Sequence, residues 1–189
     1  MTYAIEVNNL NKVYDGFELK DVCFKLETGT IMGIVGENGA GKSTIIKGIL
    51  DLINIDSGDI KIFGKDFKEN ASEIKKDISV VFDESYFHDN LKLPDIDKIM
   101  KNIYPNWDKN KFLKYTNHFK LPNNKRVKDF SRGMKMKLSI AVALSHNAKL
   151  LILDEATSGL DPVVRDEILD IFLDYIQNED CSILIASHI

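Results

Sequence analysis

The stretch Gly36-Glu37-Asn38-Gly39-Ala40-Gly41-Lys42-Ser43 has glycine, lysine and hydroxyl residues at the spacing of a phosphate-binding loop. An apolar run, IMGIVG, precedes it and a helical pattern, STIIKGIL, follows it. Glycines let successive backbone N–H groups surround a β-phosphate, and the helix N-terminus adds positive partial charge. We expect Lys42 to reach the β- and γ-phosphate oxygens, Ser43 to bind Mg²⁺ and Thr44 to border the site. The alternative, a glycine-rich turn with a solvated lysine, is disfavoured by this placement between strand and helix.

A second group of residues adds acids to this chemistry. Four apolar residues, Leu150 to Leu153, predict a buried strand that ends at Asp154 and Glu155. Ligands bind at the carboxyl ends of strands in open α/β sheets. We expect Asp154 to hold Mg²⁺ through its water shell, and Glu155 to accept a proton from an attacking water or to orient it. Two solvated acids at a strand end are the plainer alternative, which the phosphate-binding loop disfavours.

The elements that must position these residues follow from hydrophobic patterns. Alternating segments, YAIEVNNL and FELKDVCFKLE, predict an N-terminal antiparallel β layer. IMGIVG does not alternate and predicts a strand covered on both faces of a mostly parallel sheet. Residues 91–127 are rich in lysine and asparagine and predict a small helical lobe inserted into the sheet domain. After it, helices and strands alternate: RGMKMKLSIAVALSH and PVVRDEILDIFLDYIQ are predicted helices, and KLLILD and SILIAS are predicted strands. This order predicts right-handed crossover connections between the strands.

Composition limits the size and the class of the protein. A chain of 189 residues that is 44% hydrophobic and 29% charged suits one domain, with or without a lobe. The formal charge of −4 argues against nucleic acid as a partner. No basic segment followed by an apolar one opens the chain, and no apolar run is long enough to cross a bilayer. Cys23 and Cys181 lack metal-type spacing, so we expect two buried thiols in a reducing compartment, the cytoplasm.

The run FSRGMKMKLSIAVALSHNAKLLILDEATSGLDP resembles the ATP-binding subunits of ABC transporters, and the similarity covers nearly the whole chain. The resemblance implies an α/β fold of the P-loop NTPase, ABC ATPase type. That fold has a mostly parallel RecA-like core sheet, an N-terminal antiparallel β layer and a small inserted helical lobe. We expect one domain over 1–189, with 1–83 and 131–189 as the core and about 84–130 as the lobe. The chain stops at Ile189, directly after His188, so the resemblance implies that the C-terminal part of the family domain is absent and a sheet edge is exposed.

The resemblance also assigns further site residues. Phe130-Ser131-Arg132-Gly133-Met134 takes the place of the signature motif LSGGQ, so Ser131 and Gly133 are expected to bind the γ-phosphate held by a second subunit. Ser158 to Asp161 matches the D-loop, with Asp161 also a helix N-cap. His188 matches the switch histidine. Tyr14 is expected to stack on adenine, with Phe17 as a substitute.

One position departs from the family pattern. The Q-loop glutamine, which follows the ISVVF strand in the family, is replaced by Asp83 or, less favoured, by Glu84. A carboxylate binds Mg²⁺ directly, so Asp83 is expected to join the metal site. Its negative charge near the γ-phosphate is expected to slow or retune turnover.

The lobe raises two open questions about partners. Tyr86 and Phe87 either line a groove that receives helices of a membrane subunit or pack the lobe onto the sheet. A group of cations is either a solvated face or a contact with membrane headgroups or the permease; it comprises lysines 109, 111, 114, 120, 125 and 128 and Arg126.

The resemblance implies a function. We expect an ATPase that uses ATP and Mg²⁺, dimerises with itself or with another ABC ATPase subunit, and drives a separate integral-membrane permease. It would be cytoplasmic and peripheral on the inner face of the cell membrane. The chain most resembles the YtrB-like branch of exporters of Gram-positive bacteria, which favours export. The alternatives are a soluble ABC ATPase acting on a macromolecular complex and a nucleotide-gated module with low turnover.

Overall fold

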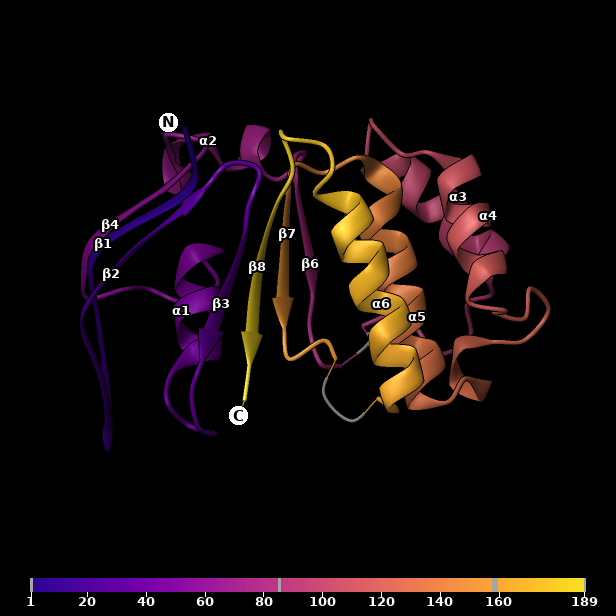
Figure 1. The fold of residues 1–189 in the computed structure, drawn as a ribbon, viewed down its shortest axis with the longest axis horizontal. Coiled ribbons are helices and arrows are strands. Elements are labelled where there is room, and N and C mark those ends of the chain that lie inside the picture. The colour runs from indigo at the N-terminus through magenta and orange to yellow at the C-terminus, as the bar shows by residue number, and fades with distance from the viewer. Residues whose placement is uncertain (1, 85, 158–159, 189) are drawn as a thin grey trace.

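A computed structural model describes residues 2–84, 86–157 and 160–188. Over these residues the chain forms two four-stranded sheets and a set of helices (Figure 1). In that view one sheet lies at the left, the second lies in the centre, and most of the helices lie at the right. The order of helices and strands along the chain is the one that the sequence patterns predict.

The first sheet is antiparallel and forms the predicted N-terminal layer. Tyr14 pairs with Phe17 at the tip of its first hairpin. Ile5 and Val7 alternate with more exposed residues and are fully buried, because this face of the sheet covers a hydrophobic core. In spatial order the strands are β2 (Phe17–Glu27), β1 (Tyr3–Tyr14), β4 (Ser57–Ile62) and β5 (Lys65–Asp66).

The second sheet is parallel, as the alternation of strands and helices predicts. In spatial order its strands are β3 (Ile31–Val35), β8 (Ser182–Ser187), β7 (Leu150–Asp154) and β6 (Ile78–Val81). Val35 pairs with Ser187, and Asp154 pairs with Ala186. Because parallel strands run in one direction, their carboxyl ends meet at one edge of the sheet, and the residues that follow them meet there too.

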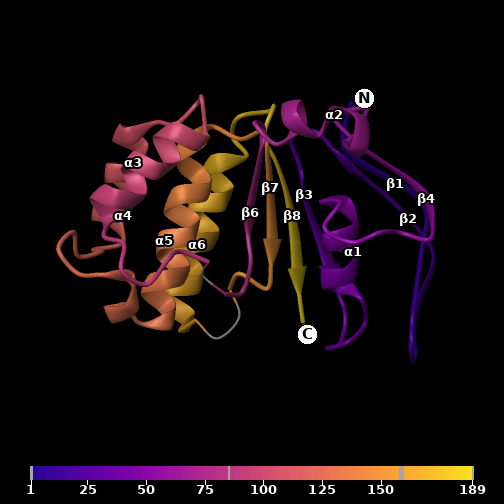
Figure 2. The same cartoon turned by 180° about the vertical axis from the view of Figure 1, so that it is seen from behind.

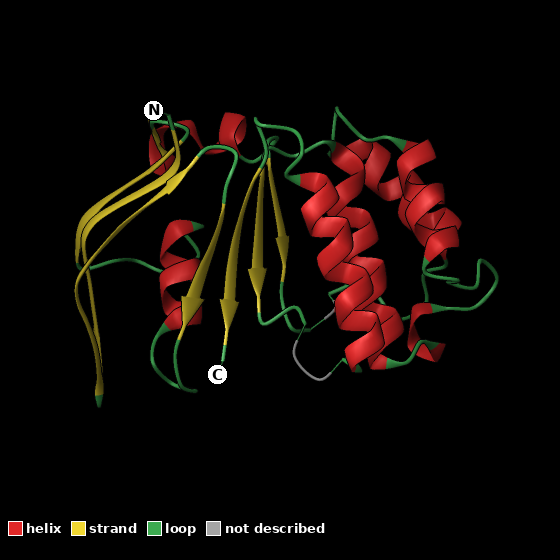
Figure 3. Ribbon diagram, in the orientation of Figure 1, coloured by secondary structure: helices red, strands yellow, loops and turns green. Residues whose placement is uncertain are grey.

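Helices cover both faces of the parallel sheet. α1 lies between the two sheets, and α5 and α6 lie on the opposite face, with α3 and α4 beyond them (Figures 2 and 3). None of the described helices is long and apolar enough to cross a membrane. We call α3, α4 and the residues that join them, 93–118, the helical lobe. The helices are α1 (Lys42–Ile49), α2 (Phe67–Ile74), α3 (Leu93–Ile103), α4 (Lys109–His118), α5 (Arg132–Ala143) and α6 (Pro162–Tyr175), with 3₁₀ turns η1 (Val127–Asp129) and η2 (Leu144–His146).

Two hydrophobic cores lie on the two faces of the parallel sheet. Leu150 and Ile152 of β7 belong to the core shared with α1 and the antiparallel layer. Leu151 and Leu153 point to the opposite face and belong to the core shared with α5, α6 and the helical lobe. Both faces of β7 are therefore covered, which explains its unbroken apolar run.

The prediction that the IMGIVG strand is covered on both faces is wrong. β3 is an edge strand of the parallel sheet, and Val35 is 61% exposed. Its partly buried residues, Met32 and Ile34, pack against the core that contains α1. A short apolar run does not tell an edge strand from a central one, because coverage depends on distant segments.

The expectation of two buried thiols is also wrong for one of them. Both cysteines are free; Cys181 is buried and Cys23 is exposed. Cys23 lies on the outer side of β2, where the Asn9 backbone N–H donates to its Sγ at 3.1 Å. Residues of β2 alternate between the two faces of the sheet, so this position falls on the solvent side.

Candidate functional site

The glycine-rich loop joins β3 to α1 at the carboxyl edge of the parallel sheet. Gly39 and Gly41 have φ values of 84° and 94°, which favour glycine, and Gly41 is the N-cap residue of α1. A Cβ placed on Gly41 would lie 2.5 Å from Leu19 Cδ2 and 2.6 Å from Phe17 Cζ. The β1–β2 hairpin therefore rests against the loop, and a Cβ at Gly41 would force the Phe17 and Leu19 side chains to move.

Lys42 is the first residue of α1 and is only 5% exposed. Its ammonium group donates to the carbonyl oxygens of Gly36 at 2.8 Å and Glu37 at 2.9 Å. The Glu155 Oε1 atom lies 3.6 Å from the same nitrogen. These acceptors compensate the burial of the charge and hold the ammonium group against the loop, where a bound phosphate would meet it.

Ser43 and Asp154 bring two oxygen donors together. The Ser43 hydroxyl donates to Asp154 Oδ1 at 3.0 Å, across 111 residues of sequence. Burial raises the pKa of Asp154, and the charges of Glu155 and Asp83 raise it further, while the Ser43 hydrogen bond lowers it. Mg²⁺ binds through one or two protein oxygens together with phosphate oxygens, so this pair fits the metal of a nucleotide complex.

Glu155 follows β7 in an unusual backbone conformation. Its φ is 54°, and its N–H donates to the Ala186 carbonyl oxygen of β8 at 3.0 Å. His188 follows β8, and its Nδ1 lies 3.8 Å from Glu155 Oε2. A left-handed conformation at a residue other than glycine costs free energy, and the contact with β8 maintains it here. The Glu155 carboxylate thereby lies between Lys42 and His188.

Asp83 follows β6 and is exposed. Its charge contributes to the raised pKa of Asp154, so the two carboxyl groups lie within electrostatic range at the same sheet edge. In the part of the chain that the structure describes, no three His, Cys, Asp or Glu side chains are grouped as a metal site. A metal ion at this edge would therefore depend on phosphate oxygens as well as on Ser43 and Asp154.

The two aromatic candidates for adenine lie on the β1–β2 hairpin. The rings of Tyr14 and Phe17 are stacked, with centroids 6.5 Å apart and planes at 28°. Phe17 is the one that touches the loop at Gly41, whereas Tyr14 is more exposed and has the Lys12 ammonium 5.2 Å from its ring centroid. Phe17 therefore lies beside the loop, and Tyr14 stacks on Phe17.

Ser131, Gly133 and Asp161 lie apart from this group. Ser131 caps α5 by accepting from the Met134 N–H at 3.2 Å, and Asp161 caps α6 by accepting from the Val164 N–H at 3.1 Å. Both helix N-termini face the same edge as the glycine-rich loop but on the other side of the sheet (Figure 1). Among the described residues no hydrogen bond or ion pair joins them to the loop; Ser158 and Gly159 of the D-loop lie outside the described residues.

A groove lies between the sheet and the helical lobe, where one of the two sequence interpretations of Tyr86 and Phe87 expected it. A hollow of about 560 Å³ is lined by Leu52, Phe82, Ile103 and Tyr104, among others, and Leu52 and Ile103 are 60% and 57% exposed. A second hollow of about 270 Å³ shares Phe82 and Tyr104 with it, and Tyr86 and Phe87 line that one. The sequence pointed to Tyr86 and Phe87 but not to Leu52, Phe82, Ile103 or Tyr104, because distant segments form the rest of the groove.

Comparison with known proteins identifies a family. The family model described as ABC transporter matches residues 19–158. The chain is 34% identical over 185 residues to the ABC transporter ATP-binding protein YtrB of Bacillus subtilis, covering 97% of this chain and 63% of that protein. It is 36% identical over 192 residues to the bacitracin transport ATP-binding protein BcrA of Bacillus licheniformis, covering 100% of this chain and 63% of that protein. It thus spans less than two thirds of the length of these relatives.

Other relatives are covered to a larger extent. The lantibiotic transport ATP-binding protein SrtF of Streptococcus pyogenes is 35% identical over 188 residues, which cover 98% of this chain and 80% of that protein. A solved structure titled "Structure of ATP binding subunit of ABC transporter" superposes with a TM-score of 0.81 at 27% identity, over 98% of this chain and 80% of that one.

Proposed function

The chain belongs to the ABC transporter family and has the P-loop ABC ATPase fold predicted from its sequence, and from this premise we propose that it binds and hydrolyses MgATP to drive a separate membrane permease. The observation that carries the proposal is the junction of Lys42, Ser43, Asp154 and Glu155 at one sheet edge. These residues combine a phosphate-binding loop, oxygen ligands for Mg²⁺ and a carboxylate for the attacking water.

The proposed chemistry divides among the residues of this site. The loop N–H groups from Gly36 to Gly41 hold the β-phosphate, and the Lys42 ammonium leaves the loop carbonyls to meet the β- and γ-phosphate oxygens. Ser43 and Asp154 hold Mg²⁺, which neutralises charge on the phosphate oxygens. Glu155 orients the attacking water or accepts its proton, and His188 contacts the γ-phosphate.

The separation of Ser131, Gly133 and Asp161 from the loop supports a dimer. Their helix N-termini offer N–H donors at the same edge, yet they lie across the sheet from Lys42. In a dimer with a second ABC ATPase subunit, identical or not, those donors bind the γ-phosphate held by the partner. The nucleotide therefore joins the two subunits.

The groove beside the helical lobe supports the permease as partner. Tyr86 is 75% exposed at the groove, and Phe87 lines the same hollow. A large exposed apolar surface favours a protein partner, so we assign the groove to a helix of the permease. The proposed place of action is the cytoplasmic face of the membrane, and the relatives named for bacitracin and lantibiotic transport favour export.

The test compares binding with hydrolysis. In Glu155→Gln we expect steady-state ATPase activity to fall by about 100-fold or more, while the Kd for MgATP stays within about twofold, because the amide cannot accept a proton. Lys42→Ala should lose binding as well. Retention of full affinity in Lys42→Ala would refute the assigned site, and copurification with a ribosome or chromosome instead of a polytopic membrane protein would refute the assigned partner.

A second candidate, a nucleotide-gated module with little turnover, is favoured by the carboxylate of Asp83 near Asp154. This module would bind MgATP and dimerise without rapid hydrolysis. Wild-type ATPase activity that disappears in Glu155→Ala while ATP binding persists would reject it.

A further inference from the structure

A buried polar cluster joins the helical lobe to the parallel sheet. Tyr104, which caps the C-terminal end of α3, lies flat on the His146 imidazole, with ring centroids 4.0 Å apart and planes at 12°. His146 ends η2, the continuation of α5, and is only 1% exposed. Its Nε2 lies within hydrogen-bond distance of the Ser79 hydroxyl of β6, and that hydroxyl donates to the Ala143 carbonyl oxygen.

The imidazole in this cluster is neutral. A hydroxyl carries one proton, so Ser79, which donates to Ala143, accepts from the Nε2–H of His146. The Nδ1 atom has no hydrogen-bond partner among the described residues. Burial lowers the pKa of His146 to about 4, which agrees with a neutral ring. Tyr104 therefore packs on an uncharged flat surface and shields it from water.

Further bonds fasten the same two segments. The Asp108 N–H donates to the Ser145 carbonyl oxygen at 2.7 Å, and the Asn147 side-chain amide donates to the Asn106 carbonyl oxygen at 3.2 Å. We call residues 104–108 together with 145–147 the α5 junction. α3 otherwise packs mainly on α4, which in turn packs on α5. The α5 junction is therefore the place where the end of α3 is tied to the sheet domain.

The position of Tyr104 links three parts of the protein. Its side chain lines both hollows of the groove. Its stacking partner His146 terminates the helical segment that begins beside Ser131. Ser79 lies on β6, which leads to Asp83. A displacement of the Tyr104 ring would therefore affect the groove, the helix that starts at Ser131 and the strand that leads to Asp83.

We propose that Tyr104 is a positioning residue, which through its stack on His146 sets the orientation of the helical lobe and holds Ser131 and Asp83 in the arrangement that hydrolysis requires. This inference rests on the proposed ATPase function. Among the described residues no hydrogen bond or ion pair joins Tyr104 to the glycine-rich loop, so its replacement should alter turnover and leave nucleotide binding by a single subunit unchanged. Only the flat ring is needed for the stack.

The experiment compares Tyr104→Leu with Tyr104→Phe in the full chain. For Tyr104→Leu we expect kcat to fall roughly 3- to 30-fold, with the Kd for MgATP within about twofold of wild type. Tyr104→Phe keeps the ring and should retain wild-type kcat. A Tyr104→Leu protein with wild-type kcat, or a Tyr104→Phe protein as slow as Tyr104→Leu, would overturn the proposal.

Two additions separate this role from others. Ile96→Val weakens the buried core of the helical lobe without touching the α5 junction, and it should keep kcat; an equal loss would show that lobe stability alone matters.

Hydrogen exchange does not depend on hydrolysis. Backbone amides of 104–108 and 131–136 should exchange faster in Tyr104→Leu than in Tyr104→Phe. If wild type hydrolyses no ATP, the proposed function fails, but the exchange comparison still tests the positioning role of Tyr104. Equal exchange rates in Tyr104→Leu and Tyr104→Phe would refute that role.

Discussion

Asp83 and Asp154 show how single residues of this site depend on one another. Both carboxyl groups lie at the carboxyl edge of the parallel sheet; burial raises the pKa of Asp154, and the charge of Asp83 raises it further. A divalent cation bound at this edge would offset that negative charge. We therefore place Asp83 in the proposed metal site, where the resembled family has a glutamine.

Removal of the Asp83 carboxylate should weaken metal binding. For Asp83→Ala we expect the Mg²⁺ concentration that gives half-maximal ATPase activity to rise about tenfold, since an oxygen ligand or an orienting partner is lost. Asp83→Gln supplies an amide oxygen and should recover part of the loss. Glu84→Ala is the neighbouring control and should behave as wild type; an unchanged Mg²⁺ dependence in Asp83→Ala would remove this residue from the metal site.

His146 makes folding stability depend on pH. Burial lowers its pKa from 6.5 to about 4, so the unfolded chain takes up a proton more readily than the folded chain between these values. The stability that the neutral His146 ring contributes to the folded state is fully present above pH 6.5, and it is lost as the pH falls from 6.5 to about 4. The loss amounts to about 2 kcal/mol at pH 5 and to about 3 kcal/mol below pH 4.

The measurement is urea unfolding at pH 7.5 and pH 5. His146→Phe keeps a ring beneath Tyr104 and removes the titrating group, so its free energy of unfolding should fall by about 2 kcal/mol less than that of wild type between the two pH values. His88 is exposed, and His88→Gln should follow wild type. If the free energy of unfolding falls equally for His146→Phe and wild type between pH 7.5 and pH 5, another group controls the acid sensitivity.

At the scale of elements, the contact between the β1–β2 hairpin and the glycine-rich loop shapes the site. The two belong to different layers, yet Phe17 and Leu19 lie so close that a side chain at Gly41 would displace them. The same hairpin carries Tyr14 and Phe17, the candidates for adenine. Packing between the layers therefore constrains the shape of the loop and the position of Phe17 beside it.

A methyl group at Gly41 tests this packing. Gly41→Ala should lower the affinity for MgATP by at least about tenfold, because alanine costs about 1–2 kcal/mol at positive φ and its Cβ displaces the hairpin from the loop. Gly64 has a φ of 74° and open space around it. Gly64→Ala should therefore lose a similar stability but keep its affinity, and an equal loss of affinity in both variants would show that strain alone is responsible.

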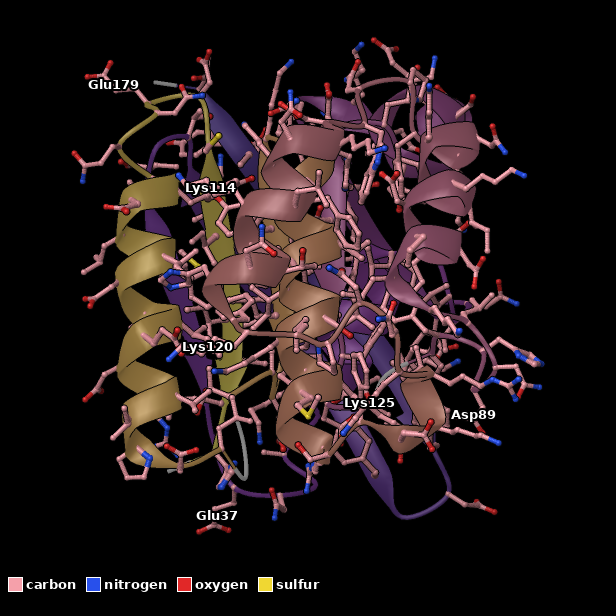
Figure 4. All side chains as sticks on the ribbon, turned by 90° about the vertical axis from the view of Figure 1, so that its right-hand side faces the viewer. Glu37, Asp89, Lys114, Lys120, Lys125 and Glu179 are labelled. Carbon is pink, nitrogen blue, oxygen red and sulfur yellow. The ribbon has the colours of Figure 1, made fainter. Side chains whose placement is uncertain are left out.

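At the scale of the whole molecule, the proposed nucleotide site joins both sides of the structure. The loop and α1 lie on one side of the parallel sheet, and α5 and α6 lie on the other (Figure 1). Lys114, Lys120 and Lys125, from α4 and the segment that follows it, lie on the side of the molecule that Figure 4 faces. Of the cations singled out in the sequence, only Lys109 has an acidic partner within 4 Å among the described residues, Asp97 at 3.7 Å.

MgATP should stabilise the whole domain, because it binds the folded state alone. At a concentration of 100 times Kd the gain is about 2.7 kcal/mol, which corresponds to a rise in Tm of roughly 5–10 °C for a chain of this size. Lys42→Ala, or removal of Mg²⁺ with a chelator, should abolish the rise. A Tm that does not respond to nucleotide would contradict the assigned site.

The sequence by itself determined the parts of this protein that depend on neighbouring residues. The phosphate-binding loop, the strand that ends at Asp154 and the helix caps at Ser131 and Asp161 follow from local spacing, backbone freedom and hydrophobic period. The confirmed order of strands and helices has the same origin, since each pattern reports the faces that a segment must bury.

Only the tertiary structure decided which distant segments meet. It placed Ser43 on Asp154, Phe17 on Gly41 and Tyr104 on His146, and it left β3 at a sheet edge and Cys23 exposed. Local patterns carry no information on such pairs, because a strand reads the same at an edge as in the centre until the segments around it are placed. The physical reason is that burial and contact belong to the packed molecule as a whole, whereas period and turn chemistry belong to the local chain.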